Sequence, residues 1–244
     1  MKIFRGDLHI HTCLSPCADL DMSPSTIVKK SLEKGLDLIA VCDHNSAENV
    51  GAVLRAGIEQ GLHVLPGIEI NSSEEVHILA LFDSEIQAKI MQDIIYRNLK
   101  GCNRPDIFGD QVVVNEYDEV EGFNDKLLIG STGLGLDEIV KETHNIGGLS
   151  IASHVDRPSY SILSQLGFIP GDLDLDAIEV TYRANDRFFT ERRQDIGELA
   201  VIKSSDAHFS NDIGTVTTSF YMKSPTVEEI RLAFRGRLGR RVEH

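Results

Sequence analysis

Short apolar runs alternate with amphipathic segments along most of the chain. Runs with the length and composition of buried strands predict strands at 3–10, 36–42, 62–70, 76–82, 149–153, 177–182 and 200–204. The helical spacing of apolar residues predicts helices at 24–35, 45–60, 84–99, 136–145 and 227–235. Asn45 and Glu48 are spaced like a capping box at the start of the second helix. Strands that alternate with helices are typical of βαβ units, so we expect an α/β barrel of about seven strands.

Residues 100–132 break this alternation, because Gly, Asn, Asp and Pro are scattered there among short apolar pieces. We interpret this stretch as an insertion or lid over the barrel, from which Arg104 and Lys126 would reach a substrate. The whole chain has 244 residues, a length that one α/β barrel fills. We therefore expect a single domain over residues 1–244.

Composition and charge narrow the choice of partners and compartment. A membrane span is not expected, because no apolar run reaches about eighteen residues. The first residues lack the apolar region of a secretory signal, which favours a cytoplasmic protein. The formal net charge of -14 and the absence of Trp predict that no long nucleic acid binds. A small anionic substrate is still compatible with this charge, because divalent cations dominate the local field of a site.

Histidines and carboxylates stand at the predicted carboxyl ends of the strands. Asp7, His9 and His11 alternate along the first strand, and residues two apart on a strand share a face. The other residues at strand ends are Asp43, His44, Glu69, His154, Asp206 and His208, and His77 lies on the fourth strand. The carboxyl ends of barrel strands meet at one mouth. So many buried polar groups would be very costly there unless they bind metal ions, so the sequence predicts a metal centre.

The order of these motifs resembles a known family. The sequence carries Asp-x-His-x-His-Thr from Asp7, Asp-His-Asn from Asp43, Gly-Ile-Glu ending at Glu69, and Ser-Asp-Ala-His ending at His208. In this order they are similar to the polymerase and histidinol phosphatase superfamily, called the PHP domain, over residues 7–208. The resemblance implies a distorted (β/α)7 barrel, two or three Zn, Mn or Fe ions, and hydrolysis of phosphate esters.

The resemblance also implies a ligand set. One metal ion would be held by His9, His11, Glu69 and Asp206, a second by Glu69, His77 and His154, and a third by His44 and His208. Family members often add a His or Asp shortly after the His-x-His pair, and this sequence has Cys17 and Asp19 there. Cys17 is slightly preferred and would favour zinc, whereas Asp19 would suit Mn or Fe. Asp7 is expected to orient a ligand histidine.

The implied activity is a metal-dependent phosphoesterase that hydrolyses small phosphomonoesters or nucleotides through a metal-bridging hydroxide. Glu69, Asp206 and His208 are its expected catalytic residues. Guanidinium groups grip phosphate in a bidentate fork, so Arg157 and Arg183 are the candidates for substrate binding, ahead of Arg187. The alternatives are a histidinol-phosphate phosphatase, a 5′–3′ exonuclease of short oligonucleotides, an amidohydrolase, and a catalytically silent PHP regulatory module that has lost its ligands.

Overall fold

The apolar runs form the strands of one curved sheet in the computed structural model, which describes residues 1–243. The strands are β1 (Lys2–Ile10), β2 (Leu38–Val41), β3 (His63–Asn71), β4 (His77–Leu81), β7 (Leu149–Ala152), β8 (Ala177–Val180), β9 (Ala200–Lys203), β10 (Thr218–Met222) and β11 (Arg241–Glu243). They lie in the order β11-β10-β1-β2-β3-β4-β7-β8-β9. The last two strands in the chain, β10 and β11, are an antiparallel addition beside β1 that the sequence pattern did not predict.

The sheet curls into a nearly closed barrel. The Thr218 hydroxyl of β10 accepts a hydrogen bond from the Lys203 backbone nitrogen of β9 and donates one to the Lys203 carbonyl. A parallel bridge also joins Ile10 to Ala207, just after β9. These contacts bring the two sides of the sheet together. The predicted barrel architecture is therefore confirmed.

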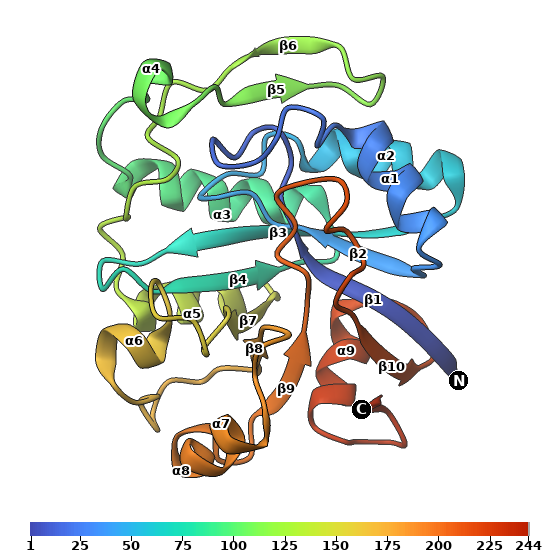
Figure 1. Cartoon of the computed structure of the whole chain (residues 1–244), viewed down its shortest axis with the longest axis vertical. Helices are drawn as coiled ribbons and strands as arrows, with labels where there is room; N and C mark the ends of the chain where they lie inside the picture. The colour runs from blue at the N-terminus through green and yellow to red at the C-terminus, as the bar shows by residue number, and fades with distance from the viewer. Residues whose placement is uncertain (244) are drawn as a thin grey trace.

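Helices cover the outside of this sheet (Figure 1). They are α1 (Pro24–Glu33), α2 (Val50–Gln60), α3 (Glu85–Asn98), α4 (Pro105–Phe108), α5 (Leu136–Asn145), α6 (Ile162–Leu166), α7 (Asp186–Glu191), α8 (Arg193–Ile196) and α9 (Val227–Phe234). An outer apolar cluster joins helix residues such as Val53 and Met91 to strand residues such as Ile68. A second cluster contains Leu8 and Leu79 from the strands. No helix among residues 1–243 combines the length and apolar character needed to cross a membrane.

Two local expectations are corrected by the structure. The second helix begins at Val50 rather than at residue 45, with Asn49 as its N-cap. Asn45 instead adopts a left-handed backbone with φ 52°. In this conformation its side-chain amide donates hydrogen bonds to the carbonyls of Leu128 and Gly130. Tertiary hydrogen bonds have thus replaced the predicted capping box.

The barrel is not wholly parallel. Strand β4 runs antiparallel to both β3 and β7, because residues 72–76 are too few for the crossover that a parallel connection requires. His77 therefore lies at the beginning of its strand and not at the end. It still reaches the same mouth, since it pairs with Asn71 at the carboxyl end of β3.

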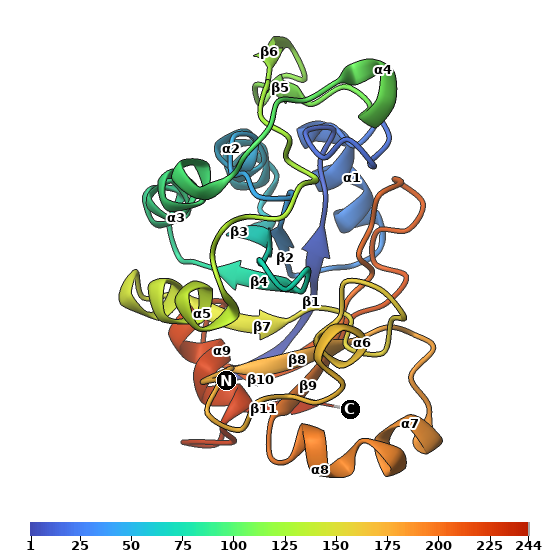
Figure 2. The ribbon, with the colours of Figure 1, turned by 90° about the vertical axis from the view of Figure 1, so that its left-hand side faces the viewer.

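The predicted insertion carries α4 and a separate two-stranded sheet of β5 (Val112–Val114) and β6 (Val120–Phe123). This hairpin lies beyond α1 and α2, apart from the main sheet (Figures 1 and 2). The buried Asn49 amide fixes it, because Nδ2 donates to the Val112 carbonyl at 3.0 Å and Oδ1 accepts from the Val114 nitrogen at 3.0 Å. The insertion is thus hydrogen-bonded to the loop that precedes α2.

Candidate metal centre

Four side chains from β1, β3 and the loop after β9 converge at the barrel mouth. His9 Nε2, His11 Nε2 and Asp206 Oδ1 lie 3.1, 3.2 and 3.3 Å from one another. Glu69 brings one oxygen to 3.4 Å from His9 Nε2 and the other to 3.5 Å from His11 Nε2. Four ligands at tetrahedral positions about 2.1 Å from a metal ion would be about 3.4 Å apart. The donor atoms of His9, His11 and Asp206 therefore have the separations expected around one shared divalent ion, and Glu69 approaches the two imidazoles with different oxygens.

Glu69 also faces three further histidines. Its Oε1 lies 2.9 Å from His77 Nδ1 and 3.1 Å from His154 Nε2, and its Oε2 lies 3.0 Å from His44 Nδ1. These residues come from β4 and from the loops after β7 and β2. One carboxylate at the end of β3 therefore connects distant parts of the chain, as a bridging ligand would.

A third group lies towards the rim. Ligand atoms of His11, His44 and His208 lie within 4.8 Å of one another. Burial alone would raise the pKa of the Cys17 thiol, but hydrogen bonds to His208 and His44 lower it to about 6. Asp19 is exposed, and its carboxylate accepts a hydrogen bond from the backbone two residues on. The Cys17 thiol therefore interacts with His44 and His208, whereas the Asp19 carboxylate is engaged by its own backbone.

The buried carboxylates and imidazoles at this mouth perturb one another's pKa values. Burial alone would raise the pKa of Glu69, but the charges of His77, His9 and His44 hold it well below its usual range. Burial alone would lower the pKa of His9, but Asp206 and two glutamates raise it well above the usual value. For His44 the effect of burial is likewise outweighed, chiefly by Glu69. Bound divalent cations supply the same positive charge, so the donor set fits them.

Glu179 is a functional residue that the sequence analysis missed. Its carboxylate lies 3.1 Å from His9 Nδ1 and accepts a hydrogen bond from the His154 backbone nitrogen at 3.1 Å. A carboxylate on the far nitrogen fixes the ring orientation and tautomer of a ligand histidine. The sequence feature that could have identified Glu179 is a single acidic residue in the otherwise apolar strand Ala-Ile-Glu-Val of β8.

Asp7 does not have the predicted orienting role. A register shift between Asp7 and Ile10 turns the face of β1 within its last residues. Leu8 and Ile10 consequently pack in different apolar clusters. The Asp7 carboxylate accepts hydrogen bonds from the backbone nitrogens of Ser205 and Gly214, so it holds the loops after β9 rather than an imidazole.

Two adjoining cavities define where a substrate can lie. The metal cavity has a volume of about 160 Å³ and is lined by His44, Glu69, His77, Ile129, His154, Arg157, Tyr160, Asp206 and His208. A side cleft of about 360 Å³ shares Arg157 and Asp206 with it and contains Arg183. Arg157 Nη2 lies 2.6 Å from Asp206 Oδ2. This ion pair stands at the boundary between the two cavities.

The other basic candidates are engaged elsewhere. Arg187 is exposed and pairs with Glu191 at 2.7 Å on α7. Arg104 pairs with Asp106, and Lys126 donates to the Tyr96 carbonyl at 3.3 Å. Arg157 lines the histidine cavity, whereas Arg183 lines only the adjoining cleft, where its Nε donates to the Tyr182 hydroxyl at 3.1 Å.

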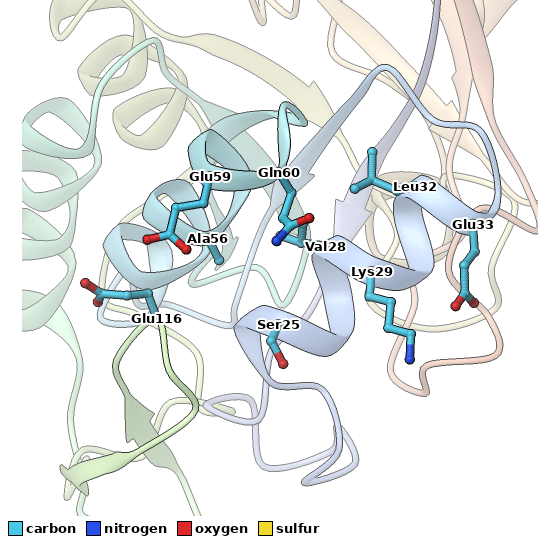
Figure 3. A pocket seen from close by; sticks show the side chains of 9 residues that line it. All are labelled: Ser25, Val28, Lys29, Leu32, Glu33, Ala56, Glu59, Gln60 and Glu116. Carbon is cyan, nitrogen blue, oxygen red and sulfur yellow. The ribbon is translucent and has the colours of Figure 1, made fainter.

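A further cavity of about 440 Å³ lies between α1 and α2 (Figure 3). Its lining includes the carboxylates of Glu33, Glu59 and Glu116 and the ammonium group of Lys29. An anionic phosphate would be repelled by this excess of carboxylates. The histidine mouth is the better place for such a substrate.

Comparisons with known proteins agree with this architecture. The chain is similar to a 5'-3' exoribonuclease of Haemophilus influenzae, with 26% identity over 128 residues that cover 50% of the chain and 46% of the relative. Its fold is similar to the lesion-specific endonuclease PfuEndoQ of Pyrococcus furiosus, with a TM-score of 0.71, 20% identity, and coverage of 99% of the chain and 58% of the endonuclease. The chain thus spans about half the length of these relatives.

The expectation that long nucleic acid does not bind is wrong. A structure of Endonuclease Q in complex with a 27-mer duplex is similar to this chain, with a TM-score of 0.67, 19% identity, and coverage of 98% of the chain and 58% of the endonuclease. Net charge sums the whole surface, whereas phosphate recognition depends on the local field. The cleft beside this mouth carries Arg157 and Arg183 in a chain whose net charge is negative.

The family itself is shown by a match to the model of the PHP domain over residues 7–225. This range contains all the strand-end motifs that suggested the resemblance. It also contains the end of β1 and the barrel strands β2, β3, β4, β7, β8, β9 and β10. The chain therefore belongs to the PHP domain family.

Proposed function

We propose that the chain is a metal-dependent hydrolase of phosphoric esters that acts on nucleotides or on the ends of nucleic acids. The observation that carries this proposal is the Glu69 carboxylate, which lies within 3.5 Å of ring nitrogens from five histidines. Shared cations account for such a buried arrangement better than hydrogen bonds alone. The printed names of the relatives, an exoribonuclease and an endonuclease, support phosphoester chemistry.

Two or three divalent ions, Zn, Mn or Fe, are the proposed cofactors. When bound, such ions lower the pKa of water and neutralise phosphoryl oxygens. The proposed ligands are His9, His11, Glu69 and Asp206 for one ion, Glu69, His77 and His154 for a second, and His44, His208 and Cys17 for a third. His44 lies close enough to Glu69 to serve the second or the third group.

Asp206 and His208 have different proposed roles. Burial alone would raise the pKa of Asp206, but His9 and His11 hold it far below its usual range. Asp206 therefore stays charged, binds a cation and positions Arg157. Burial alone would lower the pKa of His208, but Cys17 and Asp206 raise it. His208 is the group at the rim that can hold a proton for the leaving oxygen, and it can do so only while its Nε2 carries no cation.

The arginines are proposed to receive the rest of the substrate. Arg157 and Arg183 line the side cleft together with Thr181, Ser204 and Ser205. Guanidinium groups bind phosphate oxygens in a bidentate fork, and hydroxyl groups add acceptors and donors. A nucleoside or a second phosphate attached to the reacting phosphoryl group would lie in this cleft.

Metal removal followed by a substrate panel tests the proposal. After chelation and dialysis, release of phosphate from nucleotides and of the terminal phosphate from 5′-phosphorylated oligonucleotides should fall at least about a hundredfold. Adding back Mn, Zn or Fe should restore both. Metal-restored hydrolysis of amides with none of phosphate esters would overturn the proposal in favour of an amidohydrolase. Absence of both metal binding and hydrolysis would overturn it in favour of a silent module.

Cys17 is expected to bind metal through its thiolate. In protein loaded with Co²⁺, we expect a sulfur-to-cobalt charge-transfer absorption in the near ultraviolet, because a thiolate at His44 and His208 completes a soft donor set. The variant Cys17→Ser should lose this band. Cys102→Ser, which removes an exposed cysteine of the insertion, is the matched control and should retain it. Equal bands in both variants would exclude Cys17 as a ligand.

A further inference from the structure

Ile129 stands out in the metal cavity because the other lining side chains, apart from Tyr160, are histidines, carboxylates and Arg157. It belongs to the end of the insertion and is 37% exposed. Apolar side chains in a cavity built for a phosphoryl group add no binding to a phosphate oxygen. They define instead the shape and size of what fits beside that group.

The backbone around Ile129 is fixed on both sides. The Asn45 amide nitrogen donates to the Leu128 carbonyl at 2.8 Å and to the Gly130 carbonyl at 2.7 Å. Leu128 itself is fully buried against Leu14 and Leu99. Asn45 directly follows His44 in the chain. Two peptide groups that flank Ile129 are therefore tied to the neighbour of a proposed metal ligand, which holds the side chain at the cavity.

Tyr160 holds a similar place beside His77. The two rings are stacked with centroids 4.8 Å apart, and the His77 backbone nitrogen donates to the Tyr160 carbonyl at 2.9 Å. The rings of His77 and His44 are themselves 5.3 Å apart. Tyr160 thus lies on the His44–His77 side of the cavity, and Ile129 is held by Asn45, the residue after His44. Arg157 and Asp206 line both the cavity and the cleft.

The two sides of the cavity differ in chemistry. The cleft side has a volume of about 360 Å³ and offers guanidinium and hydroxyl groups. Its carboxylates Asp156, Glu179 and Asp206 are engaged by Thr181, His9 and Arg157 respectively. The Ile129 side presents an aliphatic chain and an aromatic ring. Ligand pockets usually measure about 300–1,000 Å³, so the metal cavity of about 160 Å³ accommodates a phosphoryl group and little more. A polynucleotide that continued past the reacting phosphorus on both sides would meet Ile129.

We propose that Ile129, positioned by Asn45, is a specificity-determining residue that restricts the reaction to phosphoryl groups with one organic substituent. That substituent lies in the arginine cleft, so terminal phosphates react and internal phosphodiesters are excluded. This inference rests on the proposed phosphoesterase function and names its substrate class. It assigns no part of the chemistry to Ile129, which acts through shape alone.

Paired aryl substrates test this restriction. We would measure kcat/KM for p-nitrophenyl phosphate, a monoester, and for bis(p-nitrophenyl) phosphate, a diester, in metal-loaded wild type and Ile129→Ala. The diester-to-monoester ratio should rise roughly tenfold or more in the variant, a typical effect of removing apolar bulk from a specificity pocket. Ile129→Phe should shift the ratio in the opposite direction. Ile107→Ala, at an exposed isoleucine elsewhere in the insertion, should leave the ratio unchanged.

The two proposals fail in different ways. A ratio that is the same in wild type and in both Ile129 variants, with the monoester hydrolysed, would overturn the inference and leave the phosphoesterase intact. No hydrolysis of either ester by any variant would count against the phosphoesterase. In that case competition of diphenyl phosphate with inorganic phosphate for metal-loaded protein still tests Ile129. Tighter diphenyl phosphate binding by Ile129→Ala would support the inference, and unchanged binding would overturn it.

Discussion

Replacement of Glu69 by Gln is expected to lower phosphate-ester turnover by about a thousandfold and to release bound metal. The physical reason is the position of the carboxylate, which is 1% exposed and faces five histidines. A neutral amide keeps the shape of the side chain but removes the negative charge that two proposed ions share. A continuous phosphate-release assay measures the turnover, and mass spectrometry of the same preparation measures the metal content.

The control for this substitution is Glu59→Gln in the remote cavity between α1 and α2. It makes the same chemical change on an exposed helix position and should alter neither turnover nor metal content. If Glu69→Gln retained full turnover and its metal, the ligand assignment at the centre of the site would be wrong. Excess metal should fail to restore the variant, because the missing group is itself a ligand.

Replacement of Glu179 by Gln is expected to weaken metal binding by about 10–100-fold while the same ligands remain in place. The Glu179 carboxylate fixes the His9 ring through Nδ1 at 3.1 Å, which presents Nε2 to the shared ion. It also accepts from the His154 backbone nitrogen. Titration of apo protein against a chelating dye measures the affinity directly.

Activity should distinguish the two glutamates. Turnover of Glu179→Gln should recover when metal is raised well above the weakened affinity, because the ligands themselves are intact. The matched control is Glu198→Gln, an exposed glutamate in the connection between α8 and β9, which should bind metal as the wild type does. Wild-type affinity in Glu179→Gln would show that His9 needs no such partner.

Some properties follow from the sequence alone because they depend on local patterns. A His-x-His pair ending an apolar run, such as His9 and His11, places both imidazoles on one face of a strand, where they can hold one metal ion. Polar residues at the ends of successive strands must meet if those strands form a barrel. The family, the barrel and the histidine and carboxylate cluster could therefore be predicted before any coordinates.

Other properties depend on contacts between distant segments, and only the tertiary structure decided them. A register shift in β1 turned Asp7 away from the histidines, and a short connection made β4 antiparallel. Glu179 can orient His9 because the fold brings β8 next to β1's histidine. Asn45 does not cap a helix, because its side chain donates to carbonyls more than eighty residues away in the chain. Strand register and long-range hydrogen bonds are set by the cooperative packing of the whole chain, so no local pattern encodes them.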